Sequence, residues 1–344
     1  MPTKDSEIIT RLHGWLPIGV ITIHAYWQSD VYDIQQHLQV LLSQGLFRVT
    51  IPIYFLIAGY LYFNGLEVWN TQTYLAKLRR RCLTLLVPYL LWNLVALVVG
   101  YLMALGSDSV PSVYEYLRNR GGWLILWHPP NFPLWFLRDL MIMAVAAPLV
   151  MLFVKYLRWP GLALLAVLYV THLWPISTGF SAKAVLFFSV GCYLRLYTPG
   201  QLLQLPRRWK ITCYITATML LLATIFTWGQ YEVGDYLRSA FCVVGVAAVL
   251  NLLSDLYDRQ RFRGLPKVCL QAALFIIATH TLGISTWVEH TFNALWTSMS
   301  PGTIFVKYLS SIPITYLLCL GIFTLLQHLI PRTLNLLVGG RIRQ

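Results

Sequence analysis

Two histidines near the start of the chain have the spacing of side chains on one face of a helix. His13 and His24 are eleven residues apart in the segment HGWLPIGVITIHAYW. At about 100° per residue, this separation returns to within about 20° of the same face and places the rings about 16 Å apart along the axis. A neutral imidazole can take up and return a proton near pH 7. The pair is therefore a candidate for holding the two ends of a long, thin substrate; the alternative is two structural histidines bonded to neighbouring helices.

The composition indicates that the elements carrying these histidines lie in a membrane. Of the 344 residues, 57% are hydrophobic and only 11% are Asp, Glu, Lys or Arg, and the mean hydropathy is +0.61. A soluble domain has about 25% charged residues, so this chain has too little charge to cover a soluble fold. Aromatic residues make up 14%, which excludes a disordered chain. The composition predicts a polytopic membrane protein.

We predict an all-α bundle of about ten membrane-spanning helices that forms one domain over residues 1–344. A bilayer core of about 30 Å requires roughly 20 apolar residues per helix. Ten segments approach this length: 14–30, 45–64, 83–105, 133–154, 159–175, 183–197, 211–228, 237–254, 268–288 and 304–330.

The distribution of basic residues predicts the orientation of this bundle. The net charge is +13, and with ten spans 19 of the 26 Lys and Arg residues lie on the side of the two termini. The other seven are Arg48, Arg118, Arg120, Arg138, Lys183, Arg238 and Lys307. Because basic residues collect in cytoplasmic loops, both termini are expected in the cytoplasm. No nucleic-acid-binding motif accompanies the charge, and the six cysteines form no C-x-x-C pair that would indicate a disulfide framework or a metal site.

The first helix resembles that of the acyltransferase-3 family, whose hallmark is an arginine, ten residues and a histidine. His24 matches the histidine, and Gly14 matches the glycine that follows the arginine. The arginine position is His13, and Thr10 replaces an acidic residue three positions earlier. Arg11 is a candidate for the missing charge.

Five further segments resemble the family in its order along the chain. They are RVTIPIYFLIAGYLYF at 48–63, LRRRCLTLLVPYLLW at 78–92, PLWFLRDL at 133–140, LFFSVGCYLR at 186–195 and LFIIATH at 274–280. Ala58 stands where the family has serine. Arg81 matches the first arginine of its R-x-x-R pattern, and Thr84 replaces the second.

The resemblance implies an O-acyltransferase in a bacterial cytoplasmic membrane. An acyl group, acetyl by default, would move from cytoplasmic acyl-CoA to a hydroxyl of a cell-surface polysaccharide or of its lipid-linked precursor. Acyl-CoA is then a co-substrate, and no permanently bound cofactor or metal is expected. His24 is the expected general base, although a transient acyl-histidine is an alternative. The cations expected to bind the CoA phosphates are Arg11, His13, Arg79, Arg80 and Arg81; for the last three the alternative is a positive-inside anchor.

Ionisable residues toward the outer ends of other spans are candidates for contacts to the acceptor or the transition state. They are Arg48, Arg138, Asp139 and His280. Arg138 and Asp139 are adjacent and are expected to point about 100° apart, so each is predicted to pair with another helix, with Arg48 and Asp139 as one such pair. Such structural pairing is the alternative to a role in chemistry.

Other features are assigned more simply. His172 has no motif around it and is expected to be structural. Trp123, Trp127 and His128 in the longest outer loop are expected to form an interfacial belt or a surface for a sugar ring. Asp30 and Asp33 would orient His24 only if their loop folds back.

Two other functions fit parts of the sequence. One is a transporter or flippase for a lipid-linked sugar, against which the scarcity of acidic residues within the spans argues. The other is a family member that has lost catalysis, suggested by His13 and Thr84 and opposed by the retention of His24.

Overall fold

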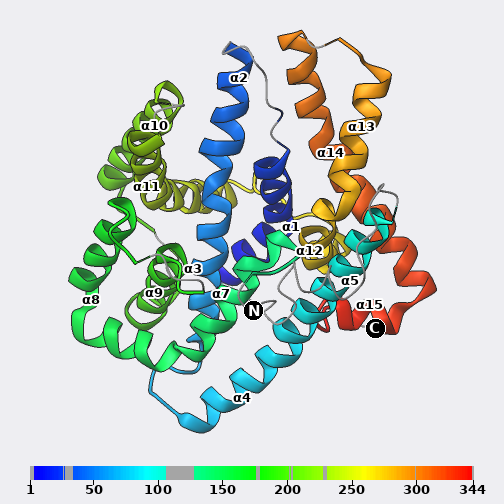
Figure 1. The fold of residues 1–344 in the computed structure, drawn as a ribbon. Helices are drawn as coiled ribbons and strands as arrows, with labels where there is room; N and C mark the ends of the chain where they lie inside the picture. Colours follow the sequence, from blue (N-terminus) through cyan, green and yellow to red (C-terminus); the bar gives the residue numbers. More distant parts are fainter. Residues whose placement is uncertain are drawn as a thin grey trace.

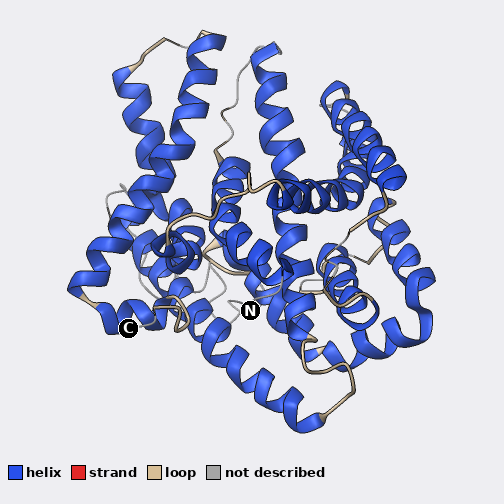
Figure 2. Cartoon of the chain, turned by 180° about the vertical axis from the view of Figure 1, so that it is seen from behind, coloured by secondary structure: helices blue, strands red, loops and turns tan. Residues whose placement is uncertain are grey.

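A computed structural model describes residues 4–25, 27, 34–105, 128–175, 179–200, 202, 204–227, 231–298 and 300–342. Across these residues every regular element is helical (Figure 2), which confirms the all-α prediction. Seven helical segments within them are long and apolar enough to cross a membrane: Ile34–Tyr62, Thr71–Met103, Ala147–Val170, Arg207–Phe226, Glu232–Asp258, Lys267–Leu295 and Pro301–Leu329.

The described elements follow one another along the chain as helices (Figure 1). In the first half they are α1 (Lys4–His24), α2 (Ile34–Gln39), η1 (Val40–Gly45), η2 (Leu46–Val49), α3 (Thr50–Tyr62), α4 (Thr71–Arg81), η3 (Cys82–Leu86), α5 (Val87–Ala104), η5 (Phe132–Leu134) and α7 (Trp135–Val145). The second half holds α8 (Ala147–Val170), α9 (Ala182–Tyr197), α10 (Arg207–Phe226), α11 (Tyr231–Asp258), α12 (Lys267–Thr279), η6 (His280–Ile284), α13 (Ser285–Leu295), α14 (Pro301–Leu329) and α15 (Pro331–Leu337).

The seven candidate spans overlap seven of the ten predicted ones, and each of the remaining three predicted segments contains helix among its described residues. Of these, α7 and α9 have only 11 and 16 residues, and α1 has 21 but begins with charged residues. The count of ten and the side on which the termini lie therefore stay predictions.

The limits of several predicted spans differ from those of the helices, and two of these differences have a clear structural cause. Helix α1 begins ten residues before the predicted start at 14, because its polar residues have partners within the protein: buried Asp5 accepts hydrogen bonds from Tyr60 Oη at 2.9 Å and from Leu202 N at 3.1 Å. The span predicted at 133–154 is divided between α7 and α8. Pro148, in the first turn of α8, has no N–H to continue the helix.

Helix α1 lies near the middle of the bundle and packs against α3, η2, α12 and α14 (Figure 1). Ile8, Leu12, Leu16 and Val20 recur every four residues along it and are all buried, as expected for one apolar face of a helix. This packing fixes the rotation of α1 and so fixes the directions of His13 and His24.

Helices α3 and α9 approach closely because each carries a glycine at the contact. A Cβ on Gly59 would lie 2.2 Å from the carbonyl oxygen of Phe188, and one on Gly191 would lie 2.1 Å from that of Leu56. Both glycines belong to segments that resemble the family, so these motifs serve the packing of the core. The contact holds α3, which carries Tyr54 into the candidate site.

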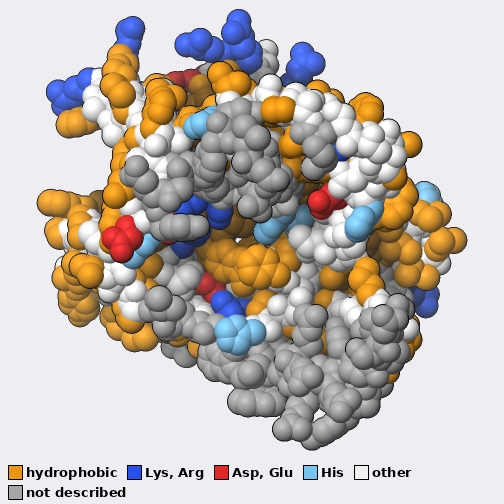
Figure 3. Space-filling view, turned by 45° about the horizontal axis from the view of Figure 1, so that its top comes forward, with side chains coloured by type: hydrophobic (Ala, Val, Ile, Leu, Met, Phe, Trp, Pro, Cys, Tyr) orange, Lys and Arg blue, Asp and Glu red, His pale blue; other side chains and the backbone are white. Residues whose placement is uncertain are grey.

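The outer surface of the bundle suits a lipid environment. Helix α10 exposes Ile215, Met219 and Leu222 on its surface, and such extended apolar faces mark contact with membrane or protein. Figure 3 shows one end of the bundle, where hydrophobic side chains cover the flanks. Basic, acidic and histidine side chains border a hollow near the centre of this face.

Candidate active site

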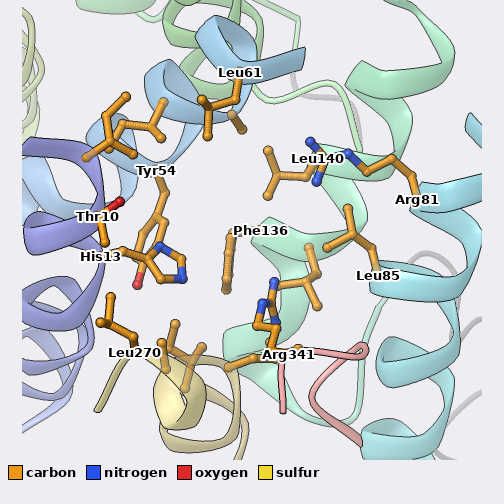
Figure 4. Close-up of a pocket in the computed structure, with 17 residues that line it drawn as sticks. Thr10, His13, Tyr54, Leu61, Arg81, Leu85, Phe136, Leu140, Leu270 and Arg341 are labelled. Atoms are coloured by element: carbon orange, nitrogen blue, oxygen red, sulfur yellow. The ribbon is translucent and has the colours of Figure 1, made fainter. Parts of the chain in front are cut away.

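His13 projects from α1 into a narrow cavity of about 340 Å³ (Figure 4). The walls are mainly apolar side chains of α1, α3, α7 and α12. The His13 ring lies edge-on to Tyr54, with 6.0 Å between ring centroids, and the Phe136 ring stacks with Tyr54 at 5.7 Å. The guanidinium groups of Arg81 and Arg341 reach into the same cavity (Figure 4). We call this cavity the slot.

A wider basic cavity of about 760 Å³ adjoins the slot and shares His13, Arg81 and Arg341 with it. We call it the vestibule. The basic residues that line it are Lys77, Arg80, Arg81, Lys267 and Arg341. In the described part of the chain no acidic side chain lines it. Such a cavity can bind a ligand that carries several negative charges.

Arg341 enters the site through a turn made by two consecutive glycines. Gly339 and Gly340 both have positive φ, 67° and 76°, and a Cβ on Gly339 would lie 2.3 Å from the carbonyl oxygen of Thr84. Only glycine fits such a turn without strain. Burial lowers the pKa of Arg341 to about 10, so the guanidinium is still charged at neutral pH.

The other predicted phosphate-binding residues divide between the vestibule and other places. Arg80 and Arg81 line it, whereas Arg79 lines neither cavity. The structure also does not bring Arg11 to either cavity. Its guanidinium donates to Glu7 Oε2 at 3.1 Å and lies 4.7 Å from the centroid of the Tyr257 ring. Arg11 therefore ties α1 to α11, and Arg341 occupies the position beside His13 that Arg11 was expected to fill.

His24, the last residue of α1, lies next to His280. Their ring centroids are 5.2 Å apart with the planes tilted by 49°, and Phe132 meets the His24 ring edge-on at 6.1 Å. His280 is fully buried, and its Nδ1 lies 3.1 Å and 2.9 Å from the carbonyl oxygens of Ile276 and Ile277. Carbonyl oxygens only accept hydrogen bonds, so Nδ1 carries the proton and Nε2 is left as an acceptor. Nε2 is buried and has no hydrogen-bond partner among the described residues.

The slot leads toward this histidine pair along two elements. Phe136 and Ile277 line the slot, and about one helical turn away Phe132 and His280 contact His24. A thin ligand that enters past His13 would therefore have its far end near His24. This arrangement agrees with the spacing of the two histidines on α1.

The predicted pairing of Arg48 with Asp139 is wrong. Arg138 donates to Asp139 Oδ1 from Nε at 3.0 Å and from Nη2 at 2.8 Å, because the long arginine side chain folds back across the 100° between the two positions. The other oxygen of buried Asp139 accepts from Ser181 Oγ at 2.7 Å. This pair therefore holds the first turn of α9. Arg48 instead donates to Gln44 and lines a separate polar cavity.

The remaining sequence assignments are placed as follows. His172 Nε2 lies 3.0 Å from Ser239 Oγ at the rim of that polar cavity. His128 is exposed. Trp123, Trp127, Asp30 and Asp33 lie outside the described residues.

Sequence reasoning missed Arg341, Lys77 and Lys267 as site residues and counted them only as cytoplasmic charges. For Arg341 a signal was present, because the pair Gly339–Gly340 after the last apolar segment predicts a sharp turn. No local pattern marks the other two, since α4 and α12 are brought together only by the fold.

Comparison with known proteins identifies the family of the chain. A family model described as an acyltransferase domain, that of the acyltransferase-3 family, matches residues 12–326. The chain is 30% identical over 288 residues to the succinoglycan biosynthesis protein ExoH of Rhizobium meliloti. The aligned region covers 76% of this chain and 74% of that protein. No solved structure gives a significant match. The chain belongs to the acyltransferase-3 family.

Proposed function

We propose that the protein transfers an acyl group, acetyl by default, from cytoplasmic acyl-CoA to a hydroxyl of a cell-surface polysaccharide or of its lipid-linked precursor. The setting would be a bacterial cytoplasmic membrane. The relative named as a succinoglycan biosynthesis protein supports a glycan as the acceptor. Family membership favours this function over a sugar flippase.

The observation that carries the proposal is that a basic cavity, the vestibule, is followed by an apolar one, the slot, which leads toward His24. Acyl-CoA has a nucleotide with several phosphates at one end and a thioester on a thin arm at the other. The vestibule would bind the phosphates through Lys77, Arg80, Arg81, Lys267 and Arg341. The slot, with its apolar walls, would hold the arm, and the thioester would lie near His24. In the predicted topology the vestibule opens to the cytoplasm.

The chemistry follows from the histidine pair. The free imidazole nitrogen of His24 takes the proton of the acceptor hydroxyl while the hydroxyl oxygen attacks the thioester carbonyl carbon. The tetrahedral intermediate then collapses, the carbon–sulfur bond breaks, and the imidazolium returns the proton to the departing thiolate of CoA. His280 Nε2, which can only accept, is suited to hold the N–H of His24 and so to point its other nitrogen at the hydroxyl. His280 is thus a positioning residue.

The test compares cells that contain the wild-type protein, the His24→Ala variant or neither. Mass spectrometry of their surface glycans should show one additional acyl group only with the wild type, and the added mass would identify the acyl group. Purified protein should also release CoA from labelled acetyl-CoA in the presence of extracted, unacylated glycan. Identical glycans in all three strains, together with no CoA release, would overturn the proposal and favour a family member without catalysis.

A further inference from the structure

A third cavity, of about 270 Å³, lies apart from the vestibule and the slot. It is formed by the ends of η2, α8, α9 and α11. Its lining is polar: Arg48, Tyr169, His172, Lys183, Asp235, Arg238, Ser239 and Cys242. Neither the donor path nor the histidine pair uses it.

Positive charge exceeds negative charge in this cavity. Three cations line it, and Asp235 is the single acidic residue that does so among the described residues. Asp235 forms an ion pair with Arg238, which leaves the charges of Arg48 and Lys183. Within the described residues Lys183 forms no ion pair, and its ammonium lies 5.9 Å from the centroid of the Trp135 ring. Arg48 donates to Gln44, but its Nε is buried with no hydrogen-bond partner in the described part of the chain.

This arrangement is costly to the fold. Arg48, Lys183 and Arg238 are half-buried and line the same cavity, so their like charges repel one another. A charge partly removed from water without a partner destabilises the folded state. A buried donor without an acceptor adds a further cost. An anionic ligand would remove both costs at once, since it would balance the charge and accept from Arg48 Nε.

One element of the cavity wall packs against the helix that carries the candidate base. The element η2, which carries Arg48, packs against α1, the helix that ends at His24. On the other side, Ser181 and Asp139 anchor the first turn of α9 and thereby place Lys183. An anionic group held here would therefore be part of a molecule whose reacting atoms lie at His24.

We propose that this cavity binds a carboxylate carried by one of the two substrates that meet at His24. The inference rests on the proposed acyl transfer and adds the chemical class of a substrate. Arg48 presents a planar guanidinium that suits the two oxygens of a carboxylate, and Lys183 supplies a second charge. The carboxylate belongs either to the acceptor glycan, as in an acidic sugar, or to the far end of the acyl group.

The main variant is Lys183→Met, which removes the charge and keeps most of the side chain. Lys155→Met is the matched control, because Lys155 is an exposed lysine outside the cavity. Transfer is measured with extracted, unacylated glycan, either intact or with its carboxyl groups chemically reduced to alcohols. The donors are acetyl-CoA, and malonyl-CoA with its longer homologue succinyl-CoA, which carry a free carboxylate.

If the glycan carries the carboxylate, Lys183→Met should raise the KM for intact glycan about 10-fold or more and should leave transfer to reduced glycan unchanged. If the acyl group carries it, the KM should rise for malonyl-CoA or succinyl-CoA and not for acetyl-CoA. The control should match the wild type throughout. Equal KM values for Lys183→Met and the wild type with every pair of substrates would overturn the proposal.

A second measurement does not depend on catalysis. Glucuronate or malonate should raise the thermal midpoint of the purified wild-type protein, and glucose should not. In Lys183→Met the shift should disappear, while the midpoint without ligand should equal or exceed that of the wild type because the repulsion of Lys183 by Arg48 and Arg238 is removed. A shift with inorganic phosphate alone, or no shift with either carboxylate, would refute the carboxylate subsite. Loss of acyl transfer in the wild type with the shift retained would instead refute only the proposed function.

Discussion

The rings of His24 and His280 lie 5.2 Å apart, although one ends α1 and the other follows α12. The backbone carbonyls of Ile276 and Ile277 fix the proton of His280 on Nδ1. The unprotonated Nε2 of a buried histidine is thus available next to the candidate base. In the proposed mechanism His24 is therefore the base, and His280 is the residue that orients it.

We predict that His24→Ala lowers kcat by about 100-fold or more and changes the KM for acyl-CoA little, because it removes the base and not the donor site. His280→Ala should lower kcat less and alter the pH profile of kcat, and His280→Gln should recover part of the loss because its amide supplies an acceptor. Steady-state kinetics of purified variants will measure both. Full activity of a folded His24→Ala protein would remove the catalytic assignment.

The contact between α3 and α9 predicts the cost of adding a methyl group to Gly191. A Cβ there would meet the backbone of α3, which cannot move aside as a side chain can. Gly191→Ala should therefore destabilise the protein by roughly 1–3 kcal/mol, measured as a lower thermal midpoint in detergent. Gly321→Ala is the control, because nothing lies within 4 Å of a Cβ at Gly321 in α14; its midpoint should be equal or higher. An equal decrease in both variants would contradict the packing argument.

Much of this architecture could be predicted, because a long apolar segment in a membrane has to satisfy its backbone hydrogen bonds internally and therefore forms a helix. The spacing of His13 and His24 correctly predicted that both face the same side of α1, since both lie against the segment 267–280. The limits of α1 could not be predicted, because the partners of Asp5 are Tyr60 and Leu202, which are distant in sequence.

The residues of the site were predicted only in part, because here too the contacts join residues that are distant in sequence or depend on how a side chain is oriented. Arg79, Arg80 and Arg81 look alike in the sequence, and only the rotation of α4 decides which of them face the vestibule. The pairing of Arg138 with its neighbour Asp139 depends on a side-chain conformation that helix geometry alone does not indicate. Arg341 reaches His13 from the opposite end of the chain.

The orientation in the membrane can be tested with fused reporters. Reporters at Arg208 and at Arg261 should report the cytoplasm, and one at Asp108 should report the outer side, because 19 of the 26 basic residues then lie inside. Phosphatase and fluorescent-protein fusions give opposite signals and control for expression. A reversed result at any of the three sites would undo the count of ten spans and the cytoplasmic access of the donor.

The three consecutive arginines at the end of α4 provide a test with an internal control. Arg81 lines both the slot and the vestibule, Arg80 lines the vestibule, and Arg79 lines neither. Arg81→Gln should raise the KM for acyl-CoA about 10-fold, Arg80→Gln should raise it less, and Arg79→Gln should have little effect. All three remove one positive charge from the same helix, so an equal rise in KM would mean that the charges act only through the general field.

The last prediction concerns His13, which occupies the position of the family's arginine, and Arg341, which lies in the same cavity. Arg341 falls outside residues 12–326, the part that matches the family model. We expect that Arg341 supplies to the CoA phosphates the charge that His13 lacks. Arg341→Gln should then raise the KM for acyl-CoA about 10-fold with little change in kcat.

Adding His13→Arg to the Arg341→Gln variant should restore most of the donor affinity, since arginine binds phosphate with a fixed charge and a bidentate fork. In the wild-type background His13→Arg should improve donor binding little, because Arg341 and Arg81 already line that cavity and would repel a third guanidinium. His13→Ala alone should raise the KM and leave kcat nearly unchanged. A double-mutant cycle on KM measures the coupling between the two positions. Independent effects, with no rescue by His13→Arg, would show that Arg341 and His13 do not share one role.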